Sequence, residues 1–372
     1  MKTPLVETTS VVAEHETLVE PAPQLSWLPW HRARRSFISV AIPLGALVVA
    51  FGVGAILLLI AGADPIVGYR ALVHGAFGTR TAVIETFVKT TPILLVALGV
   101  AVAFRCSQWN IGAEGQLQLG AVGAAVVGKL LFGWPTIIAV PLMLLTGFLA
   151  GGLYASIAGI LKAKWEVNEV ITTIMMNFVA ILFTSYLVYG PLRDPTAAGQ
   201  PMSAMIAESA QLPRLLERGR LHAGVIIAGL SAIAVYILLW KTTLGYQIRA
   251  VGRNPRAARH AGISVPRSIF LAMAISGGLA GLAGMGEIAG IQYRLLEGFS
   301  AGFGSTGTVV ALLGNLHPAL IVPAAILFGA LLNGADSMAR TVQVSTSIVV
   351  VIQGLMVLFV LGSQFIVSKL ED

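Results

Sequence analysis

The chain has 372 residues, of which 56% are hydrophobic and only 11% are charged. Soluble domains carry about 25% charged residues, so this composition excludes a large soluble core and predicts an all-α, polytopic membrane protein. The net charge of +7 comes from basic residues placed between hydrophobic runs, which indicates membrane topology and no nucleic-acid partner. The single cysteine, Cys106, excludes an internal disulfide and a cysteine-cluster metal site, and the six histidines show no metal-binding pattern.

Residues 1–36 are predicted to form a disordered cytoplasmic tail that ends in an interfacial Trp and Arg segment. Residues 37–367 form the predicted transmembrane domain, and residues 368–372 a cytoplasmic C-terminus. Because a transmembrane helix needs about 20 apolar residues, we expect spans at about residues 37–61, 86–104, 110–132, 136–161, 168–189, 222–240, 268–291, 318–333 and 347–367.

The run at residues 304–313 is too short to span the membrane alone and is expected to be a short or broken helix. Counting it gives ten helices with both termini in the cytoplasm, while totals of nine and eight stay open. Spans two to five and seven to ten could form an inverted repeat, because one block starts outside and the other inside. The connection at about 190–221 is then outside, and the basic connection at about 241–267 is cytoplasmic.

A polar cluster interrupts the apolar sequence between the second and third spans. If residues 110–120 are helical, Asn110, Glu114 and Gln118 share one face, and Gln116 points elsewhere. These amide and carboxylate groups could line a pathway for a polar solute, or they could only hold helices together. We favour the pathway, because several amides and an acid exceed what helix association requires.

Two further motifs accompany this cluster. In the stretch 168–177, Thr173 and Asn177 are four residues apart, and spacing alone favours pathway lining and packing equally. In the basic connection, Asn254 and Pro255 can start a short helix that Gly262 ends. A connection needed only for topology requires charge but no defined helix, so we interpret this element as a surface for a soluble partner.

The glycine-rich stretch 277–290 is expected to pack very closely on neighbouring helices, because small residues recur every three or four positions. A resemblance of residues 123–129 to a P-loop is rejected, since Leu130 stands where Ser or Thr is required. Any use of ATP must therefore come from another chain. An intramembrane hydrolase built on Ser305 and His317 would require the two side chains to be in contact.

These motifs together resemble the permease subunits of bacterial ABC importers, in the nucleoside or simple-sugar branch of the superfamily that also contains ribose and branched-chain amino acid permeases. The resemblance covers about residues 37–361. It rests on Asn110-Ile-Gly-Ala-Glu-Gly-Gln116, on residues 168–177, on residues 249–263 and on Phe328-Gly-Ala330.

The resemblance implies a type II importer permease of about ten helices in a bacterial inner membrane, paired with a second, different permease. Two ATPase subunits, which hold ATP and Mg, would bind below, and an extracytoplasmic solute-binding lipoprotein would bind outside. We expect that this chain is not itself an enzyme and that it holds no cofactor. Its solute pathway would contain Asn110, Glu114, Gln116, Gln118, Thr173 and Asn177.

The resemblance also assigns two contact surfaces. The coupling element would contain Arg253, Asn254, Pro255, Arg256, Ala257, Ala258, Arg259 and Gly262. The lipoprotein would bind at Arg193, Arg214 and Arg218. Nucleosides are the expected solute, with simple sugars and branched-chain amino acids as alternatives. A proton-coupled secondary transporter with Glu114 as the protonated group is the alternative from another class.

Overall fold

The described part of the chain is built from helices, with three isolated β-bridges in the connections. The computed structural model describes residues 48–196, 199–217 and 219–345, and also residues 45, 348, 350–352, 354–355, 358–359 and 362–363. The predicted tail at 1–36, the predicted C-terminus at 368–372 and Arg218 lie outside the described residues.

Six helices in the described part are long and apolar enough to cross a membrane, which makes this a multi-pass membrane protein. A bent pair, Val48–Ile60 and Pro65–Phe77 (α2), would add a seventh span despite its bend of 118°. The predicted total of ten and the inverted repeat are not confirmed. The six helices are α3 (Arg80–Arg105), α5 (Thr136–Trp165), α6 (Glu169–Tyr189), α7 (Gly224–Lys241), α10 (Val265–Glu287) and α12 (Pro318–Val342).

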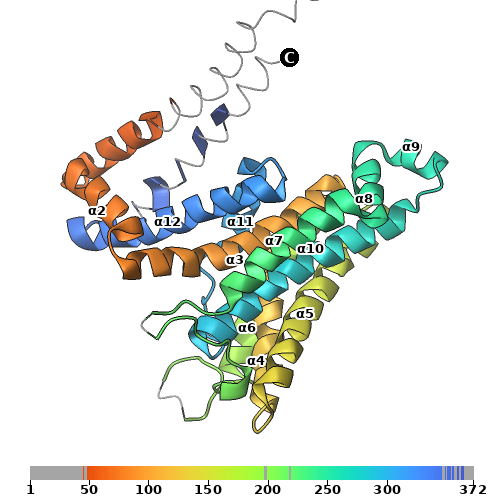
Figure 1. Ribbon diagram of the computed structural model, residues 1–372, viewed down its shortest axis with the longest axis horizontal. Coiled ribbons are helices and arrows are strands. Elements are labelled where there is room, and N and C mark those ends of the chain that lie inside the picture. The colour runs from red at the N-terminus through yellow and green to blue at the C-terminus, as the bar shows by residue number, and fades with distance from the viewer. Residues whose placement is uncertain are drawn as a thin grey trace, which may run out of the picture.

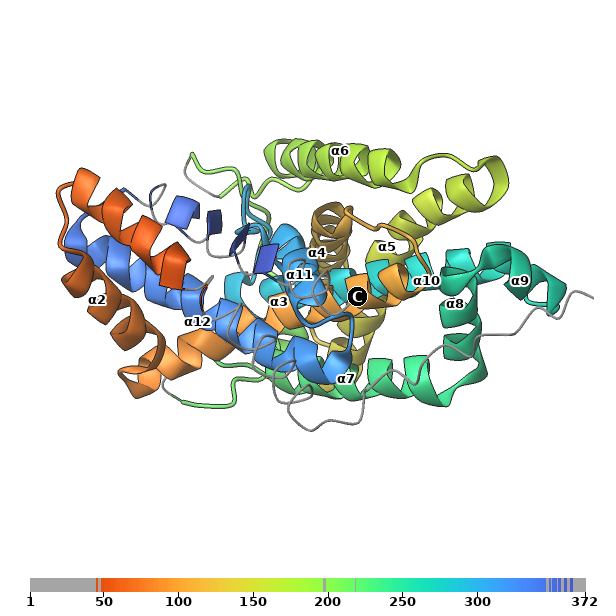
Figure 2. The same ribbon diagram turned by 90° about the horizontal axis from the view of Figure 1, so that it is seen from above.

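Helices α3 and α10 form the centre of the protein, with α6 and α7 on opposite sides of them (Figure 2). In the most apolar part of each helix, 83% of α3 and 72% of α10 is buried, against 17% of α6 and 28% of α7. The outer helices expose rows of large apolar side chains, such as Leu182 on α6 and Leu230 on α7. Surfaces this apolar are suited to lipid or to a second membrane subunit.

The glycine-rich face of α10 confirms the predicted close packing. A Cβ atom added to Gly281 would lie 2.1 Å from the carbonyl oxygen of Gly147 on α5. A Cβ on Gly284 would lie 1.9 Å from the carbonyl oxygen of Leu117 on α4 (Ala113–Leu130). Two helix backbones therefore approach α10 more closely than any side chain would allow.

Polar contacts join α12 to α2 and α3. The Asn333 amide donates to the carbonyl oxygens of Gly75 (2.8 Å) and Ala82 (2.9 Å). Lys89 on α3 forms an ion pair with Asp336 and donates to the carbonyl oxygen of Leu332. These contacts satisfy polar groups in an apolar setting, where an unpaired group is costly.

The predicted short helix is present as α11 (Phe303–Leu313), followed by a break before α12. Asn315 and Leu316 have positive φ angles in this break. Ser305 donates to the carbonyl oxygen of Gly302 at the start of α11, whereas His317 packs on the ring of Trp240 beyond its end. Ser305 and His317 are thus separated by the length of α11, and they form no hydrolytic pair.

Candidate functional site

The polar cluster lies in the loop between α3 and α4 and in the first turn of α4. Asn110, at the centre of the cluster, is fully buried. The Asn110 amide nitrogen donates to Gln116 Oε1 and to Ser276 Oγ on α10, both at 2.9 Å. Its oxygen accepts from Gln116 Nε2 (2.8 Å) and from the Gly112 N–H (3.1 Å). All four hydrogen-bonding positions of the amide are occupied, so Asn110 fixes this loop to both α4 and α10.

The prediction that Asn110 shares a helical face with Glu114 and Gln118 is wrong. Helix α4 begins only at Ala113, so Glu114 and Gln118 share the helix while Asn110 precedes it. Gln116, which was expected to point elsewhere, is instead bonded to Asn110. The reason is local: the Asn110 side chain accepts from the backbone two residues on, an Asx turn that competes with helix formation.

The two predicted polar motifs meet in the structure. Asn177 on α6 accepts from the Gly115 N–H (2.7 Å) and donates to the Ile111 carbonyl (2.9 Å). Thr173, also on α6, accepts from the Ile111 N–H at 3.3 Å and donates to the carbonyl of Glu169. Backbone groups near a helix start lack partners within the helix, and α6 supplies them here.

Glu114 connects α4 to α11. Its Oε2 accepts from the Gly304 N–H at 2.7 Å, at the N-terminus of α11, which has no capping side chain of its own. A negative charge at this end of a helix is favourable, because the helix dipole is positive there. In the described part of the chain, Glu114 Oε1 has no hydrogen-bond partner, which leaves one carboxylate oxygen for another ligand.

Two buried amide oxygens near this network have no hydrogen-bond partner in the described part of the chain: Gln108 Oε1 and Gln118 Oε1. Both side chains are 5% exposed. Leaving a buried acceptor unpaired costs about 1–3 kcal/mol, so such groups mark places where a solute or water supplies the missing partner. Among the described residues, no group of three or more His, Cys, Asp or Glu could hold a metal ion.

The predicted coupling element is a separate short helix, α9 (Pro255–His260), that follows α8 (Thr243–Arg253) and projects from one end of the protein (Figure 1). Asn254 caps it by accepting from the N–H groups of Arg256 and Ala257, both at 3.0 Å. Gly262 has a φ of +80° just beyond it. The prediction of a helix between Asn254 and Gly262 is therefore confirmed.

The residues of α9 divide into one that anchors the helix and several that are exposed. Ala258 is 4% exposed and packs against the protein core. Since the rest of α9 is open, it presents a basic surface with small residues among the charges, and its contact with a soluble partner stays a prediction. Of the residues predicted for the coupling element, all except Ala258 are exposed: Arg253, Asn254, Pro255, Arg256, Ala257, Arg259 and Gly262.

The connection at 190–221 packs against the other end of α10. The Ser203 N–H donates to the Leu295 carbonyl, and the Leu212 N–H donates to the Ala289 carbonyl. Arg193 is exposed, and the exposed Arg214 donates to the Tyr293 hydroxyl. Their predicted role in binding a lipoprotein stays a prediction.

His222, at the end of this connection, is 2% exposed, and its Nδ1 accepts from the Gly224 N–H at 3.1 Å. Burial lowers the pKa of His222 from its usual 6.5 to about 4. Below pH 6.5 the unfolded chain therefore binds a proton that the folded chain excludes. The contribution of His222 to stability is complete above pH 6.5 and falls as the pH drops toward 4, by about 1.4 kcal/mol per pH unit.

Replacing His222 by asparagine will flatten the pH dependence of unfolding between pH 6.5 and 4.5. The asparagine side chain keeps an acceptor for the Gly224 N–H but does not titrate in this range. The measurement is the unfolding temperature of the purified protein at several pH values, compared between wild type and His222→Asn. Equal slopes in the two proteins would contradict the assignment of the acid sensitivity to His222.

Residues 82–361 match the family described as the permease component of the branched-chain amino acid transport system. The chain belongs to this permease family. The permease is 40% identical to the guanosine ABC transporter permease protein NupP of Bacillus subtilis over 339 residues, which cover 89% of this chain and 96% of NupP. No solved structure matches the permease significantly.

Two further relatives differ in the solutes that their names give. The permease is 35% identical to the nucleoside ABC transporter permease protein NupB of Lactococcus lactis over 314 residues, which cover 81% of this chain and 85% of NupB. It is 33% identical to the glucose ABC transporter permease protein TsgB13 of Haloferax volcanii over 340 residues, which cover 89% of each chain.

Several partners of the polar cluster were not identified from the sequence. Ser276 and Gly304 complete the bonds of Asn110 and Glu114, yet each lies more than 150 positions away along the chain. Ser276 has a weak sequence signal, as one hydroxyl at the head of the glycine-rich stretch of α10. Gly304 contributes only its backbone N–H, so no side-chain pattern could have revealed it.

Proposed function

We propose that this permease is the membrane subunit of an ATP-driven importer of nucleosides. The observation that carries the proposal is the 40% identity to a permease named for guanosine, which extends over 96% of that relative. The likeness to NupB supports the same solute class. TsgB13 makes glucose the competing solute.

In this proposal the solute passes beside the start of α4. A nucleoside presents ribose hydroxyls and base edges that both donate and accept hydrogen bonds, so amide and carboxylate side chains suit it. Asn110, Gln116, Thr173 and Asn177 hold this part of the pathway in place, while Glu114 and Gln118 provide the polar groups for the solute. The free Oε1 of Glu114 and the unpaired Oε1 of Gln118 support this division.

In this proposal, partner subunits supply the energy and the solute for transport through this region. A separate ATPase binds α9 on the cytoplasmic side, a second permease completes the pathway, and a solute-binding lipoprotein supplies the solute at the connection 190–221. The position of α9 and this connection at opposite ends of α10 supports this arrangement (Figure 1). The permease then lies in a bacterial inner membrane with both termini in the cytoplasm.

Uptake of radiolabelled guanosine tests the proposal. Cells that express the permease with its partner subunits are expected to accumulate guanosine, and excess unlabelled adenosine or uridine should compete where glucose and leucine do not. Uptake should stop when the ATPase carries a Walker lysine substitution. Competition by glucose alone, or uptake that survives the ATPase substitution but stops with an uncoupler, would reject the nucleoside importer.

Charge reversal on α9 is expected to lower ATP-driven uptake about tenfold or more. Arg256→Glu with Arg259→Glu places two negative charges on an exposed contact surface, and mismatched charges at an interface cost several kcal/mol. Folding should be unaffected because both side chains are exposed. Uptake and the amount of folded permease are measured together.

Arg70→Glu is a control for surface charge, with one reversed charge in place of two. Arg70 is also exposed, but it lies on α2, at the opposite end of the protein from α9 (Figure 1). Equal losses of uptake in Arg70→Glu and in the α9 variant would show that general surface charge, and not α9, is responsible.

A further inference from the structure

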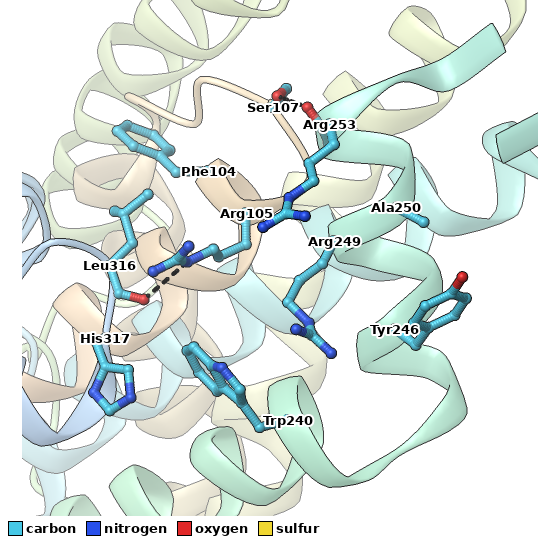
Figure 3. Close-up of a pocket in the computed structure, with 11 residues that line it drawn as sticks. Phe104, Arg105, Ser107, Trp240, Tyr246, Arg249, Ala250, Arg253, Leu316 and His317 are labelled. Carbon is cyan, nitrogen blue, oxygen red and sulfur yellow. Dashed lines mark hydrogen bonds between the residues drawn. The ribbon is translucent and has the colours of Figure 1, made fainter. Parts of the chain in front are cut away.

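A pocket of about 600 Å³ lies at the α9 end of the protein, where it borders the α3–α4 loop at Ser107. It is formed by the end of α3, the end of α7, one side of α8 and the loop that precedes α12. Figure 3 shows three arginine guanidinium groups directed into this space beside two aromatic rings and a histidine. These residues are Arg105, Arg249, Arg253, Trp240, Tyr246 and His317.

The three arginines share the pocket without a counter-charge. In the described part of the chain, no carboxylate forms an ion pair with any of them. Arg105 donates to the carbonyl oxygens of Asn315 (2.9 Å) and Leu316 (3.2 Å), and Arg249 Nε is buried without a hydrogen-bond partner among the described residues. The positive charges of three arginines that line one pocket repel one another. A bound anion would therefore stabilise the pocket.

The Trp240 ring contacts two of the three guanidinium groups, those of Arg105 and Arg249. The Arg105 guanidinium carbon lies 5.5 Å from the centroid of the Trp240 ring, and that of Arg249 lies 5.9 Å from it. Cation–π contacts of this kind orient the groups but do not neutralise their charge. The planar donor forks of arginine match the oxygens of phosphate groups.

An exposed apolar row on α7 ends at this pocket. Leu230, Ile233 and Ile237 are exposed along one face of α7, and Tyr236 stacks on Trp240 with ring centroids 5.7 Å apart. Acyl chains can lie along such a face, while aromatic residues at its end occupy the headgroup level. A free phosphate ion would make no use of this apolar row.

We propose that the pocket binds the phosphate of an anionic phospholipid headgroup, with the acyl chains lying along α7. Basic pockets between transmembrane helices are suited to such headgroups. Because α8 forms one side of the pocket and leads directly into α9, the bound lipid would stabilise the position of α9. The proposal does not depend on the solute that the permease transports.

The test is lipid-dependent thermal stability of the purified full-length permease in detergent, with native mass spectrometry to count bound lipids. Phosphatidylglycerol is expected to raise the unfolding temperature and to remain bound, while phosphatidylcholine and inorganic phosphate should have little effect. Arg249→Gln and Arg253→Gln should each weaken phosphatidylglycerol binding about fivefold, so that half-maximal stabilisation needs a lipid concentration about five times higher, as expected for the loss of one basic residue near an anionic lipid.

Arg267→Gln is the matched control, since Arg267 is exposed near the start of α10 and outside the pocket. Arg253 is exposed, so its substitution tests the proposal even if Arg249→Gln does not fold, and Arg249→Lys keeps the charge at that position. An equal response to phosphatidylcholine, full stabilisation by inorganic phosphate alone, or equal weakening in Arg267→Gln would overturn the proposal.

Discussion

Replacing Gly281 by alanine is expected to destabilise the permease strongly and to lower the amount of folded protein. The added methyl group would lie 2.1 Å from the carbonyl oxygen of Gly147 and 3.0 Å from the Cα atom of Gly151. Both atoms belong to the backbone of α5, which cannot rotate away as a side chain can. Overpacking costs about 1–3 kcal/mol where side chains adjust, and displacing two helix backbones will cost at least as much.

Gly286→Ala, in the same helix, is the control for Gly281→Ala. Outside the local backbone of α10, no heavy atom lies within 4 Å of a Cβ at Gly286, so this variant should express and unfold like the wild type. Size-exclusion profiles in detergent and unfolding temperatures are compared for the two variants. A normal unfolding temperature for Gly281→Ala would mean that α5 and α10 are farther apart than described.

Replacing Asn110 by alanine is expected to destabilise the permease by about 2 kcal/mol or more. The change removes four hydrogen bonds and leaves Gln116 and Ser276 buried without this partner. Each buried polar group left unpaired in water-soluble proteins costs about 1–3 kcal/mol, and hydrogen bonds within membranes average about 0.6 kcal/mol each. The unfolding temperature should therefore fall, and uptake should fall with it.

Gln118→Met separates a structural role from contact with solute. The Gln118 oxygen has no partner in the described part of the chain, so an apolar side chain of similar length should leave the unfolding temperature unchanged. If Gln118 binds the solute, guanosine uptake will fall despite the intact fold. Unchanged uptake in Gln118→Met would remove this residue from the pathway. For Asn110→Ala, an unchanged unfolding temperature would contradict the role of Asn110 in holding the loop.

The helices that could be predicted from the sequence are those with strong local signals. Long apolar runs located α3, α5, α7 and α10, and the Asn254 cap with Gly262 located α9. These signals are local because hydrophobic length and capping depend on neighbouring residues. The close packing of α10 was also predictable, because small residues at helical spacing leave few alternatives.

Contacts between distant parts of the chain could not be predicted. Lys89 and Asp336 pair across 247 positions, and no pattern in one sequence connects them. The same holds for Glu114 and Gly304, which are 190 positions apart. The position predicted for Asn110 was wrong for a different reason. The prediction from polar spacing required Asn110 to be helical, whereas its side chain accepts from the Gly112 N–H and so competes with helix formation.

Helix α10 connects the α9 end of the permease to the connection 190–221. Its 23 residues extend about 35 Å from the base of α9 to the backbone contacts of the 190–221 connection. A tilt of about 5° at one end of a rod this long displaces the other end by about 3 Å, more than those backbone hydrogen bonds can stretch. The π-helical turn Ile288–Gln292 follows α10 at the end that the 190–221 connection contacts. A tilt of α10 would therefore have to be accommodated by a change of backbone conformation at this turn.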